Sequence, residues 1–385
     1  MLRLGLQRLA GLAPGAARAV WSGLPAPVAE RLRALVYPIA LGPRGSGLKL
    51  EVPGSAPRRF DVLLAETATA DERRAATELA ARGHRMIELE PGWALERLAR
   101  EHDVFDAAVF GALSAGAARD ATRLGWRLLP QPFPRVSVVI VAFGGEDLLR
   151  NCLAALSRNT AWPELQSIVV DNGTRDGTFA FLEAEARRDP RLTVIRNREN
   201  VGFARAANQG IRRASGEYLV LLNDDTVVGP GWLSRLIAAL ERDRSLGLVC
   251  AATNHIGNAA RVPAAYADLE QMERFAKARA FSHAGQLLGL TSVALFCAAM
   301  RRQLLEAIGL LDERFEIGMF EDDDLSRSLR ARGATLGVAL DAFVHHVGQA
   351  SFGRMGAREY LAIWEANRRR FELKWQERWT LPEAP

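Results

Sequence analysis

Two clusters of acidic residues lie where carboxylates could take part in chemistry. The first, Asn223-Asp224-Asp225, directly follows the apolar run LVLL, so the end of a strand would present it. Carboxylates at that density suit Mg²⁺ or Mn²⁺, which proteins often hold with one or two carboxylates together with substrate phosphates. The alternative is a turn in which these side chains bond to their own backbone. These residues alone leave both interpretations open.

The second cluster, Glu321-Asp322-Asp323-Asp324, opens an amphipathic segment that ends at Gly333. Acidic residues in a first helical turn complement the exposed N–H groups, so helix capping explains one or two of them. Four in succession also raise one another's pKa, and a carboxyl group with a raised pKa is suited to take a proton from a hydroxyl group. The pattern therefore favours a general base at the start of this helix.

A pair of histidines follows later in the chain. His345 and His346 close the strand-like run DAFVHH, and neighbouring residues of a strand point to opposite faces. At most one of them can face a given site, where its imidazole could complete the coordination that Asp225 begins. The alternative is that both are hydrogen-bonded residues of the core.

The stretch after Arg135 contains the elements that would position these residues. Four apolar runs predict strands, at residues 136–143, 167–172, 192–197 and 217–225, and helical segments separate them. Such alternation predicts a parallel sheet with helices on both faces, and ligands bind these sheets at the carboxyl ends of the strands. Because polar residues follow the strands, the pattern indicates one site along one edge of the sheet.

The first 130 residues are organised differently. Residues 1–59 carry nine Arg and Lys against two Glu, which is typical either of a poorly ordered basic leader or of a segment that contacts anionic lipid. Residues 60–130 contain a strand, a helix that stops at Gly83 and a second strand, and they predict a small α/β segment of unknown role. Prolines near residues 130–135 mark the boundary before the main domain, residues 135–385.

The composition is that of a globular protein, with 49% apolar and 25% charged residues. Cys152, Cys250 and Cys297 lie far apart, which excludes a disulfide framework and a zinc cluster of neighbouring thiolates. No run of about 18 uncharged apolar residues predicts a transmembrane helix. We therefore expect a cytoplasmic protein, either free or peripheral on the inner face of the cytoplasmic membrane.

Six sequence blocks follow one another in the chain: VSVVIVAF, IVVDNGTRDGT, NRENVGFARAANQG, GEYLVLLNDDTVVGPGWL, MFEDDDL and HHVGQASFG. Taken in order, they resemble the inverting family 2 glycosyltransferases of GT-A fold, in particular bacterial members that build cell-surface polysaccharides. Each block is weakly specific, but their order and approximate spacing over residues 135–378 are highly specific. The resemblance implies an α/β fold of GT-A type, a mostly parallel sheet with helices on both faces, preceded by the small α/β segment.

The resemblance also implies roles for individual residues. The donor nucleotide would contact Val141, Ala142, Asp171, Asn172, Asn200, Gly202, Phe203, Ala204, Asn223 and Asp224. Asp225 and His346 would hold the metal, and Asp322 would be the general base with Glu321 and Asp324 as partners. Asn223 stands where the family usually has Asp, which leaves most direct metal ligation to Asp225. The first strand ends in VAFGG instead of a Thr-Tyr-Asn type sequence, so the base of the donor is not specified.

The implied reaction is a direct displacement at the anomeric carbon with inversion, which needs a base and an electrostatic clamp but no organic cofactor. The donor would be a UDP-, dTDP- or GDP-linked sugar, the acceptor a glycan or a lipid-linked glycan, and no nucleic acid would take part. Residues 253–281 would form the acceptor side, with Asn254 and Asn258 as hydroxyl contacts. The alternatives are a sugar nucleotidyltransferase and a non-catalytic module that binds nucleotide or glycan.

The C-terminal stretch YLAIWEANRRRFELKWQERW places large apolar residues on one helical face. These residues are Leu361, Trp364, Phe371, Trp375 and Trp379. Side chains with this spacing usually pack onto a domain. The alternative is a helix that lies on the cytoplasmic membrane, with Arg368, Arg369 and Arg370 facing anionic headgroups.

Overall fold

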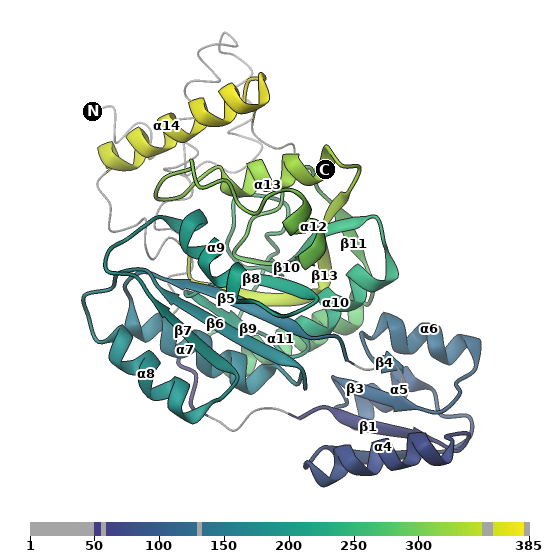
Figure 1. The fold of residues 1–385 in the computed structure, drawn as a ribbon. Coiled ribbons are helices and arrows are strands. Elements are labelled where there is room, and N and C mark those ends of the chain that lie inside the picture. The colour runs from purple at the N-terminus through teal and green to yellow at the C-terminus, as the bar shows by residue number, and fades with distance from the viewer. Residues whose placement is uncertain (1–49, 55–58, 129–132, 349–356, 381–385) are drawn as a thin grey trace.

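The computed structural model describes residues 50–54, 59–128, 133–348 and 357–380. These residues form two sheets, which Figure 1 shows next to each other. Most of the basic leader expected in residues 1–59 lies outside the described residues. Leu50 and Val52 are described, and both are buried in the core of the larger sheet. The Val52 N–H donates a hydrogen bond of 3.0 Å to Asn151 Oδ1 on a helix of that core.

The smaller sheet has four parallel strands in the order β2-β1-β3-β4. Its elements are β1 (Asp61–Ala65), α4 (Ala70–Ala81), β2 (Arg85–Leu89), α5 (Leu95–Glu101), β3 (Ala107–Phe110), α6 (Ala115–Arg123) and β4 (Arg127–Leu128). Helix α4 begins where Thr69 and Glu72 form a capping box, and it ends before Gly83, whose φ of +87° favours glycine. These elements confirm the strand-helix-strand unit that the sequence predicts.

The smaller sheet packs against α10 (Trp232–Arg242), a helix of the larger one. Ser234 Oγ donates a buried hydrogen bond to Asp106 Oδ1, and the Arg235 guanidinium lies 4.6 Å from the centre of the Phe105 ring. Both contacts come from the loop just before β3, so this loop joins the smaller sheet to the larger one.

The larger sheet has nine strands among the described residues, in the order β11-β13-β10-β12-β8-β5-β6-β7, with β9 paired to β13. They are β5 (Val136–Ala142), β6 (Leu165–Asp171), β7 (Leu192–Arg196), β8 (Tyr218–Asn223), β9 (Thr226–Val228), β10 (Leu246–Thr253), β11 (Leu287–Gly289), β12 (Cys297–Arg301) and β13 (Thr335–His346). The four strands β5 to β8 are parallel, as predicted. Strands β9, β11 and β12 pair antiparallel with their neighbours, so the second half of the sheet is mixed.

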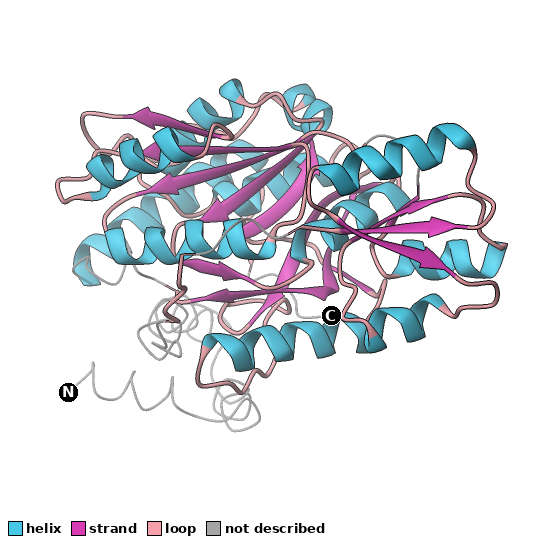
Figure 2. Cartoon of the chain, turned by 90° about the horizontal axis from the view of Figure 1, so that it is seen from below, coloured by secondary structure: helices cyan, strands magenta, loops and turns pink. Residues whose placement is uncertain are grey.

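Helices cover both faces of the parallel half. Because α7 (Glu146–Asn159) and α8 (Thr178–Arg188) lead from β5 to β6 and from β6 to β7, right-handed crossovers put them on the same face. Helix α9 (Phe203–Arg213) returns from β7 to β8 in the opposite direction and lies on the other face (Figure 1). Figure 2 shows helices on both sides of the strands.

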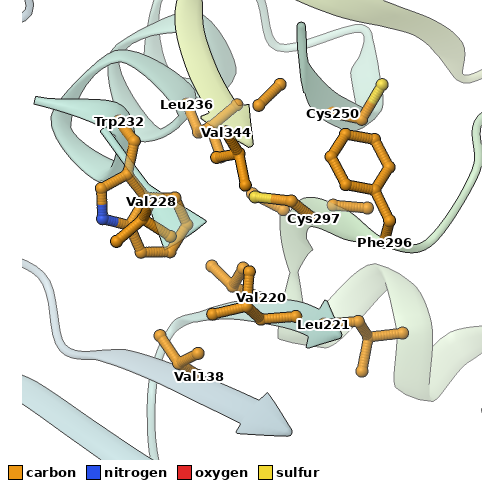
Figure 3. Packing of buried hydrophobic residues seen from close by; sticks show 14 of the residues in the cluster. Val138, Val220, Leu221, Val228, Trp232, Leu236, Cys250, Phe296, Cys297 and Val344 are labelled. Atoms are coloured by element: carbon orange, nitrogen blue, oxygen red, sulfur yellow. The ribbon is translucent and has the colours of Figure 1, made fainter. Parts of the chain in front are cut away.

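Aliphatic and aromatic side chains fill the core of the larger sheet. Figure 3 shows Val138 and Val220 of the central strands near Val228 and Trp232, all of them fully or almost fully buried. The three cysteines are also buried, and each is a free thiol. Burial raises the pKa of Cys152 to about 12, so this thiol is neutral at physiological pH.

The chain then continues through α11 (Leu269–Ser282), α12 (Arg302–Ala307), α13 (Glu321–Arg330) and the C-terminal α14 (Ala357–Trp375). Trp364 and Phe371 of α14 are buried against Phe315 and Phe320, which precede α13. This contact confirms the interpretation that the aromatic face of the helix packs onto the domain. Leu373, on the opposite face, is 72% exposed. None of the described helices is long and apolar enough to cross a membrane.

Candidate active site

The register of the parallel strands brings the predicted donor residues to one edge. Val141 on β5 pairs with Asn223 on β8, and Ala142 pairs with Asp171 on β6. The Asn172 N–H extends this ladder by donating to the Ala142 carbonyl at 2.8 Å. The carboxyl ends of β5, β6 and β8 therefore lie next to one another, where an α/β sheet binds ligands.

Asp224 connects the end of β8 to the end of β5. Its Oδ2 accepts a hydrogen bond of 3.2 Å from the Phe143 N–H, and the side chain is buried. Burial, together with the neighbouring Asp225 carboxylate, raises the pKa of Asp224 to about 7. Asp224 therefore fixes the geometry of this edge.

Asp225 meets His346 because β9 pairs with the end of β13. Thr226 is opposite His346 in this antiparallel ladder, and Val347 N–H donates to the Asp225 carbonyl at 3.0 Å. His346 Nε2 lies 3.2 Å from Asp225 Oδ1. Burial lowers the pKa of His346, but the attraction and hydrogen bond of Asp225, together with the hydrogen bond to the His255 carbonyl and the attraction of Asp224, outweigh burial and raise it.

His345 points to the other face of β13, as the alternation along a strand predicts. Its Nδ1 lies 2.7 Å from the Tyr266 hydroxyl oxygen, and the side chain is fully buried. His346 is therefore the histidine that faces Asp225, and His345 is a hydrogen-bonded core residue.

Asp225 and His346 form a donor set that suits a divalent cation shared with a substrate. Across the described ranges, no three His, Cys, Asp or Glu side chains gather as a ready-made metal cage. Mg²⁺ and Mn²⁺ are commonly bound by one or two carboxylates and completed by substrate phosphates, and imidazole also binds Mn²⁺. A carboxylate oxygen and an imidazole nitrogen at one strand edge fit this kind of site.

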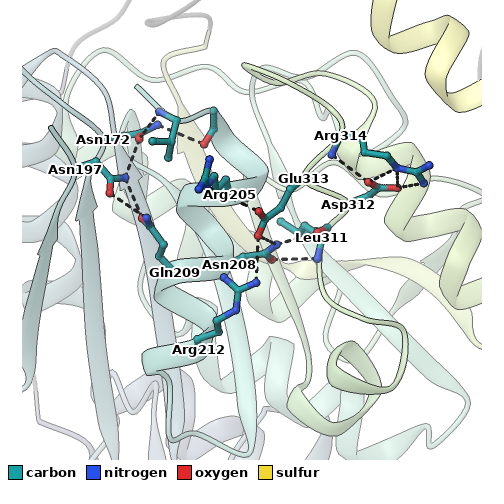
Figure 4. Close-up of polar contacts among 12 residues, drawn as sticks. Asn172, Asn197, Arg205, Asn208, Gln209, Arg212, Leu311, Asp312, Glu313 and Arg314 are labelled. Atoms are coloured by element: carbon teal, nitrogen blue, oxygen red, sulfur yellow. Dashed lines mark hydrogen bonds and ion pairs between the residues drawn. The ribbon is translucent and has the colours of Figure 1, made fainter. Parts of the chain in front are cut away.

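The loop after β7 is held to the end of β6 by amide side chains (Figure 4). Asn172 Nδ2 donates to Asn200 Oδ1 at 2.9 Å, and Asn172 Oδ1 accepts from Asn197 Nδ2 at 3.0 Å and from the Val201 N–H at 3.1 Å. Gly202 ends this loop with a φ of +86°. The structure thus brings together Asn172, Asn200 and Gly202, which the sequence assigned to the donor site.

Asp171 is 0% exposed, and its Oδ1 accepts a hydrogen bond of 2.9 Å from the Thr174 N–H. The Arg196 Nε atom lies 3.8 Å from its Oδ2. The carboxylate therefore stabilises the turn after β6, while its expected contact with the nucleotide base remains a proposal.

The four acidic residues at the start of α13 divide into two pairs. Asp323 accepts hydrogen bonds from Ser292 Oγ at 2.5 Å and from Trp379 Nε1 at 2.8 Å. Asp324 accepts from Trp375 Nε1 at 2.9 Å, and from Lys374 Nζ of α14 at 2.7 Å. Asp323 and Asp324 therefore anchor the C-terminal segment.

Glu321 and Asp322 make no such contact with α14 among the described residues, and both are half-buried. Burial raises the pKa of Asp322 well above its usual range, and the negative charges of Asp323 and Glu321 raise it further. Burial likewise raises the pKa of Glu321 to about 7. This pair keeps the properties expected of a proton acceptor, whereas Asp324 is placed with α14 instead of acting as a partner of Asp322.

A short segment, residues 292–296, links the start of α13 to the strand edge through Asp323. Ser292 bonds to Asp323 at one end of the segment, while the Phe296 carbonyl accepts from the Asn223 N–H at 2.8 Å at the other end. The Phe296 ring also stacks on His346, with centroids 5.2 Å apart. Four peptide units span at most about 14 Å, so the two ends of the segment are no farther apart. The start of α13 therefore lies near the edge that carries Asp225 and His346.

Comparison with known proteins identifies the domain that holds this site. Residues 137–309 match the family model described as Glycosyl transferase family 2. The chain contains a family 2 glycosyltransferase domain. The match confirms the family and the α/β fold of GT-A type that the six motifs imply, and it confirms that the domain belongs to a class of transferase enzymes.

Curated relatives match parts of the chain. The O-antigen biosynthesis protein RfbC of Myxococcus xanthus is 29% identical over 223 residues, which cover 55% of this chain and 17% of RfbC. An uncharacterized glycosyltransferase of Haemophilus influenzae is 29% identical over 110 residues, which cover 29% of this chain and 34% of that protein. The chain thus spans about a third or less of the length of these relatives.

Among solved structures, GalNAc-T7 with UDP, GalNAc and Mn²⁺ aligns with a TM-score of 0.47 and 18% sequence identity, covering 57% of this chain and 45% of that one. A likeness at this level does not bear on the ligands of the glycosyltransferase domain described here.

Residues that sequence patterns missed also lie at this site. His255 is nearly buried, and its ring centroid is 6.1 Å from that of His346. The carbonyl of His255 lies 2.9 Å from His346 Nδ1, which orients the imidazole toward Asp225. Phe143 is 40% exposed and lies directly after the end of β5. An aromatic residue at the end of a predicted strand is the sequence pattern that could have indicated it.

The two asparagines expected to bind the acceptor are engaged with backbone atoms. Asn254 Oδ1 accepts from the His346 N–H at 2.8 Å, and Asn254 Nδ2 donates to the His346 carbonyl at 3.1 Å. Asn258 Oδ1 accepts from the Ala260 N–H at 3.0 Å. Asn254 therefore holds the end of β13, and Asn258 stabilises a turn.

Proposed function

We propose that this chain is a metal-dependent, inverting glycosyltransferase that moves a sugar from a nucleoside-diphosphate sugar to an acceptor hydroxyl. The observation that carries the proposal is the connection of two groups through one short segment. Asp225 with His346 forms the group at the sheet edge. Glu321 with Asp322 forms the other at the start of α13, where residues 292–296 run from the adjacent Asp323 to that edge. A donor bound between them would have its diphosphate near the first group and its anomeric carbon near the second.

Asp225 and His346 would hold a divalent Mn²⁺ or Mg²⁺ ion. When bound, such an ion supplies positive charge that offsets the charge developing on the departing nucleoside diphosphate. Asp224 would contribute by fixing the backbone of Phe143, and the partly exposed Phe143 ring offers an apolar surface to the donor. The loop of Asn172, Asn200 and Gly202 would shape the rest of the donor site.

Asp322 would act as the general base. The acceptor oxygen attacks the anomeric carbon as the bond from that carbon to the diphosphate oxygen breaks, and the hydroxyl proton passes to the Asp322 carboxylate. A base with a raised pKa accepts this proton more readily than an ordinary aspartate. Inversion follows because a single displacement has no covalent enzyme intermediate.

The biological setting is proposed from the relatives. The name of RfbC refers to O-antigen biosynthesis, which favours a role in surface polysaccharide or glycan synthesis. The acceptor would then be a glycan or a lipid-linked glycan, contacted by residues 253–281. The donor would be a UDP-, dTDP- or GDP-linked sugar, and the enzyme would act in the cytoplasm or on the inner face of the cytoplasmic membrane.

A donor screen tests this function. The purified chain is incubated with UDP-, dTDP- and GDP-sugars and a glycan acceptor, with Mn²⁺, with Mg²⁺ and with a chelator. Release of nucleoside diphosphate that requires both metal and acceptor would support the proposal. Release of pyrophosphate from a nucleoside triphosphate and a sugar phosphate would instead indicate a nucleotidyltransferase, and binding without turnover of any donor would indicate a non-catalytic module.

We expect the rate of transfer to fall at acid pH around a pKa well above the value of about 4 of an ordinary aspartate. Burial and the charges of Asp323 and Glu321 raise the pKa of Asp322, and the base must be ionised to act, so kcat is lost as pH falls through this raised pKa. Glu321→Gln removes one of these charges and should move the acid limb of the kcat profile to lower pH. An unchanged limb in this variant would show that another group titrates.

A further inference from the structure

The turn that leads into α13 has an unusual backbone. Ile317, Gly318, Met319 and Phe320 have φ values of 66°, 155°, 78° and 73°. Three of these four residues are not glycine, and a β-branched residue such as isoleucine is disfavoured at positive φ. Such a conformation persists only where the surroundings hold it in place, and it is frequent at functional sites. We call residues 317–320 the left-handed turn.

One side chain of α14 holds this turn through its carbonyl groups. Asn367 is 0% exposed, and its Nδ2 donates to the carbonyls of Gly318 at 2.7 Å, Glu316 at 3.1 Å and Met319 at 3.3 Å. Asn367 Oδ1 accepts from Arg370 Nη1 at 2.6 Å. The chemistry fixes the orientation of the amide, because carbonyl oxygens need a donor and a guanidinium needs an acceptor.

The left-handed turn contacts both halves of the proposed active site. We call residues 197–202, the loop after β7, the donor loop. The Phe203 N–H, directly after this loop, donates to the Ile317 carbonyl at 3.0 Å. Gly202 approaches so closely that a Cβ atom there would lie 2.9 Å from the Ile317 nitrogen. Glu321 and Asp322 follow the turn directly in the chain. The conformation of residues 317–320 therefore determines where the acidic pair lies relative to the donor loop.

We propose that Asn367 is a positioning residue for sugar transfer: it holds the left-handed turn and thereby sets the place of Asp322 relative to the donor loop. This inference rests on the proposed function. It assigns to α14 a part in catalysis beyond covering the domain. Displacement of a base by about 1 Å can lower a rate about 100-fold, so a backbone clamp of this kind has a large effect on turnover.

Asn367→Leu tests the inference, because leucine has a similar size but no hydrogen-bond donor. The matched control is Phe371→Leu, which weakens the apolar packing of the same helix face on the Phe320 ring of the turn but leaves the Asn367 hydrogen bonds in place. The pair therefore separates the loss of the carbonyl hydrogen bonds from a loss of packing. We expect Asn367→Leu to lower kcat by about 100-fold with a change of only a few-fold in the KM for donor. Phe371→Leu should lower the thermal midpoint at least as much and keep kcat within a few-fold of wild type.

Arg370→Met is a second variant that keeps Asn367 but removes the guanidinium that orients its amide. A smaller loss of kcat in the same direction is expected, and this variant serves where Asn367→Leu fails to fold. If folded Asn367→Leu or Arg370→Met keeps kcat within a few-fold of wild type while Asp322→Asn is inactive, the inference is wrong and the proposed function stands.

Amide hydrogen exchange of residues 316–325 separates the clamp from the proposed function. We expect faster exchange of this segment in Asn367→Leu than in Phe371→Leu, whether or not a donor has been found. Equal exchange in the two variants would overturn the inference. If Asn367→Leu loses protection from exchange and the wild-type protein transfers no sugar, the result would support the clamp and reject only the assigned reaction.

Discussion

Asp322→Asn is expected to lower sugar transfer by about 100- to 10,000-fold, the contribution typical of a general base. Asparagine has the same shape and can still accept the hydrogen bond of 2.9 Å that the Asp323 N–H donates to Asp322 Oδ1. It lacks the carboxylate that takes the proton, so the loss falls on kcat. Nucleoside-diphosphate affinity in the presence of Mn²⁺, measured by calorimetry, should stay within a few-fold of wild type.

Asp324→Asn is the matched control for this prediction. It makes the same change two residues farther along the same helical turn, but its carboxylate is paired with Lys374 and Trp375 of α14. We expect a lower thermal midpoint, because the lysine loses a partly buried ion pair, and a kcat within a few-fold of wild type. Residual turnover in Asp322→Asn comparable to that of Asp324→Asn would reject Asp322 as the base.

The parts of the site that depend on neighbouring strands could be predicted from sequence. Val141, Asp171 and Asn223 each end an apolar run, and parallel pairing necessarily puts these ends on one edge. The two-residue alternation of a strand likewise predicted that only one of His345 and His346 would face Asp225. Such inferences succeed because the determining pattern lies within a few residues of the side chain concerned.

The parts that depend on contacts distant in sequence could not be predicted. Asp322 and Asp324 have the same chemical type and the same helical turn, and only the packing of α14, about fifty residues later, separates their roles. No sequence pattern indicates a positioning role for Asn367, because an asparagine within a helical segment is common and its carbonyl partners are known only from the structure. The antiparallel strands β11 and β12 were missed for a related reason, since short apolar runs do not reveal their pairing.

His255 shows how a missed contact changes the interpretation of a predicted residue. Sequence patterns predict a role for His346 through its imidazole alone, whereas the structure orients that imidazole through the carbonyl of His255 and fixes its backbone through Asn254. Residues 253–281 are expected to form the acceptor side. Within them, the contacts of Asn254 and His255 with His346 support the proposed metal site, which is how outer residues commonly hold a histidine ligand.

Asp225→Ala is expected to remove metal-dependent donor binding together with turnover. In the wild-type protein, a nucleoside diphosphate with Mn²⁺ at about 100 times its Kd stabilises the fold by about 2.7 kcal/mol. If the variant binds about 100-fold more weakly, the same ligand concentration adds only about 0.4 kcal/mol, so the thermal shift nearly disappears. The measurement is the thermal midpoint with nucleotide, with Mn²⁺, and with both.

The fold should tolerate this change, because the pKa of His346 is raised chiefly by the attraction of Asp225 acting against burial. Without that carboxylate, burial shifts the pKa of His346 downward and favours the neutral imidazole, which limits the cost of the lost partner. The two histidines supply a matched pair of further variants. His346→Gln should also weaken the Mn²⁺-dependent shift, whereas His345→Gln, which breaks the contact with Tyr266 on the other face of β13, should lower the midpoint without changing that shift. A full shift in both Asp225→Ala and His346→Gln would place the cation away from this strand edge, and the metal assignment would then be wrong.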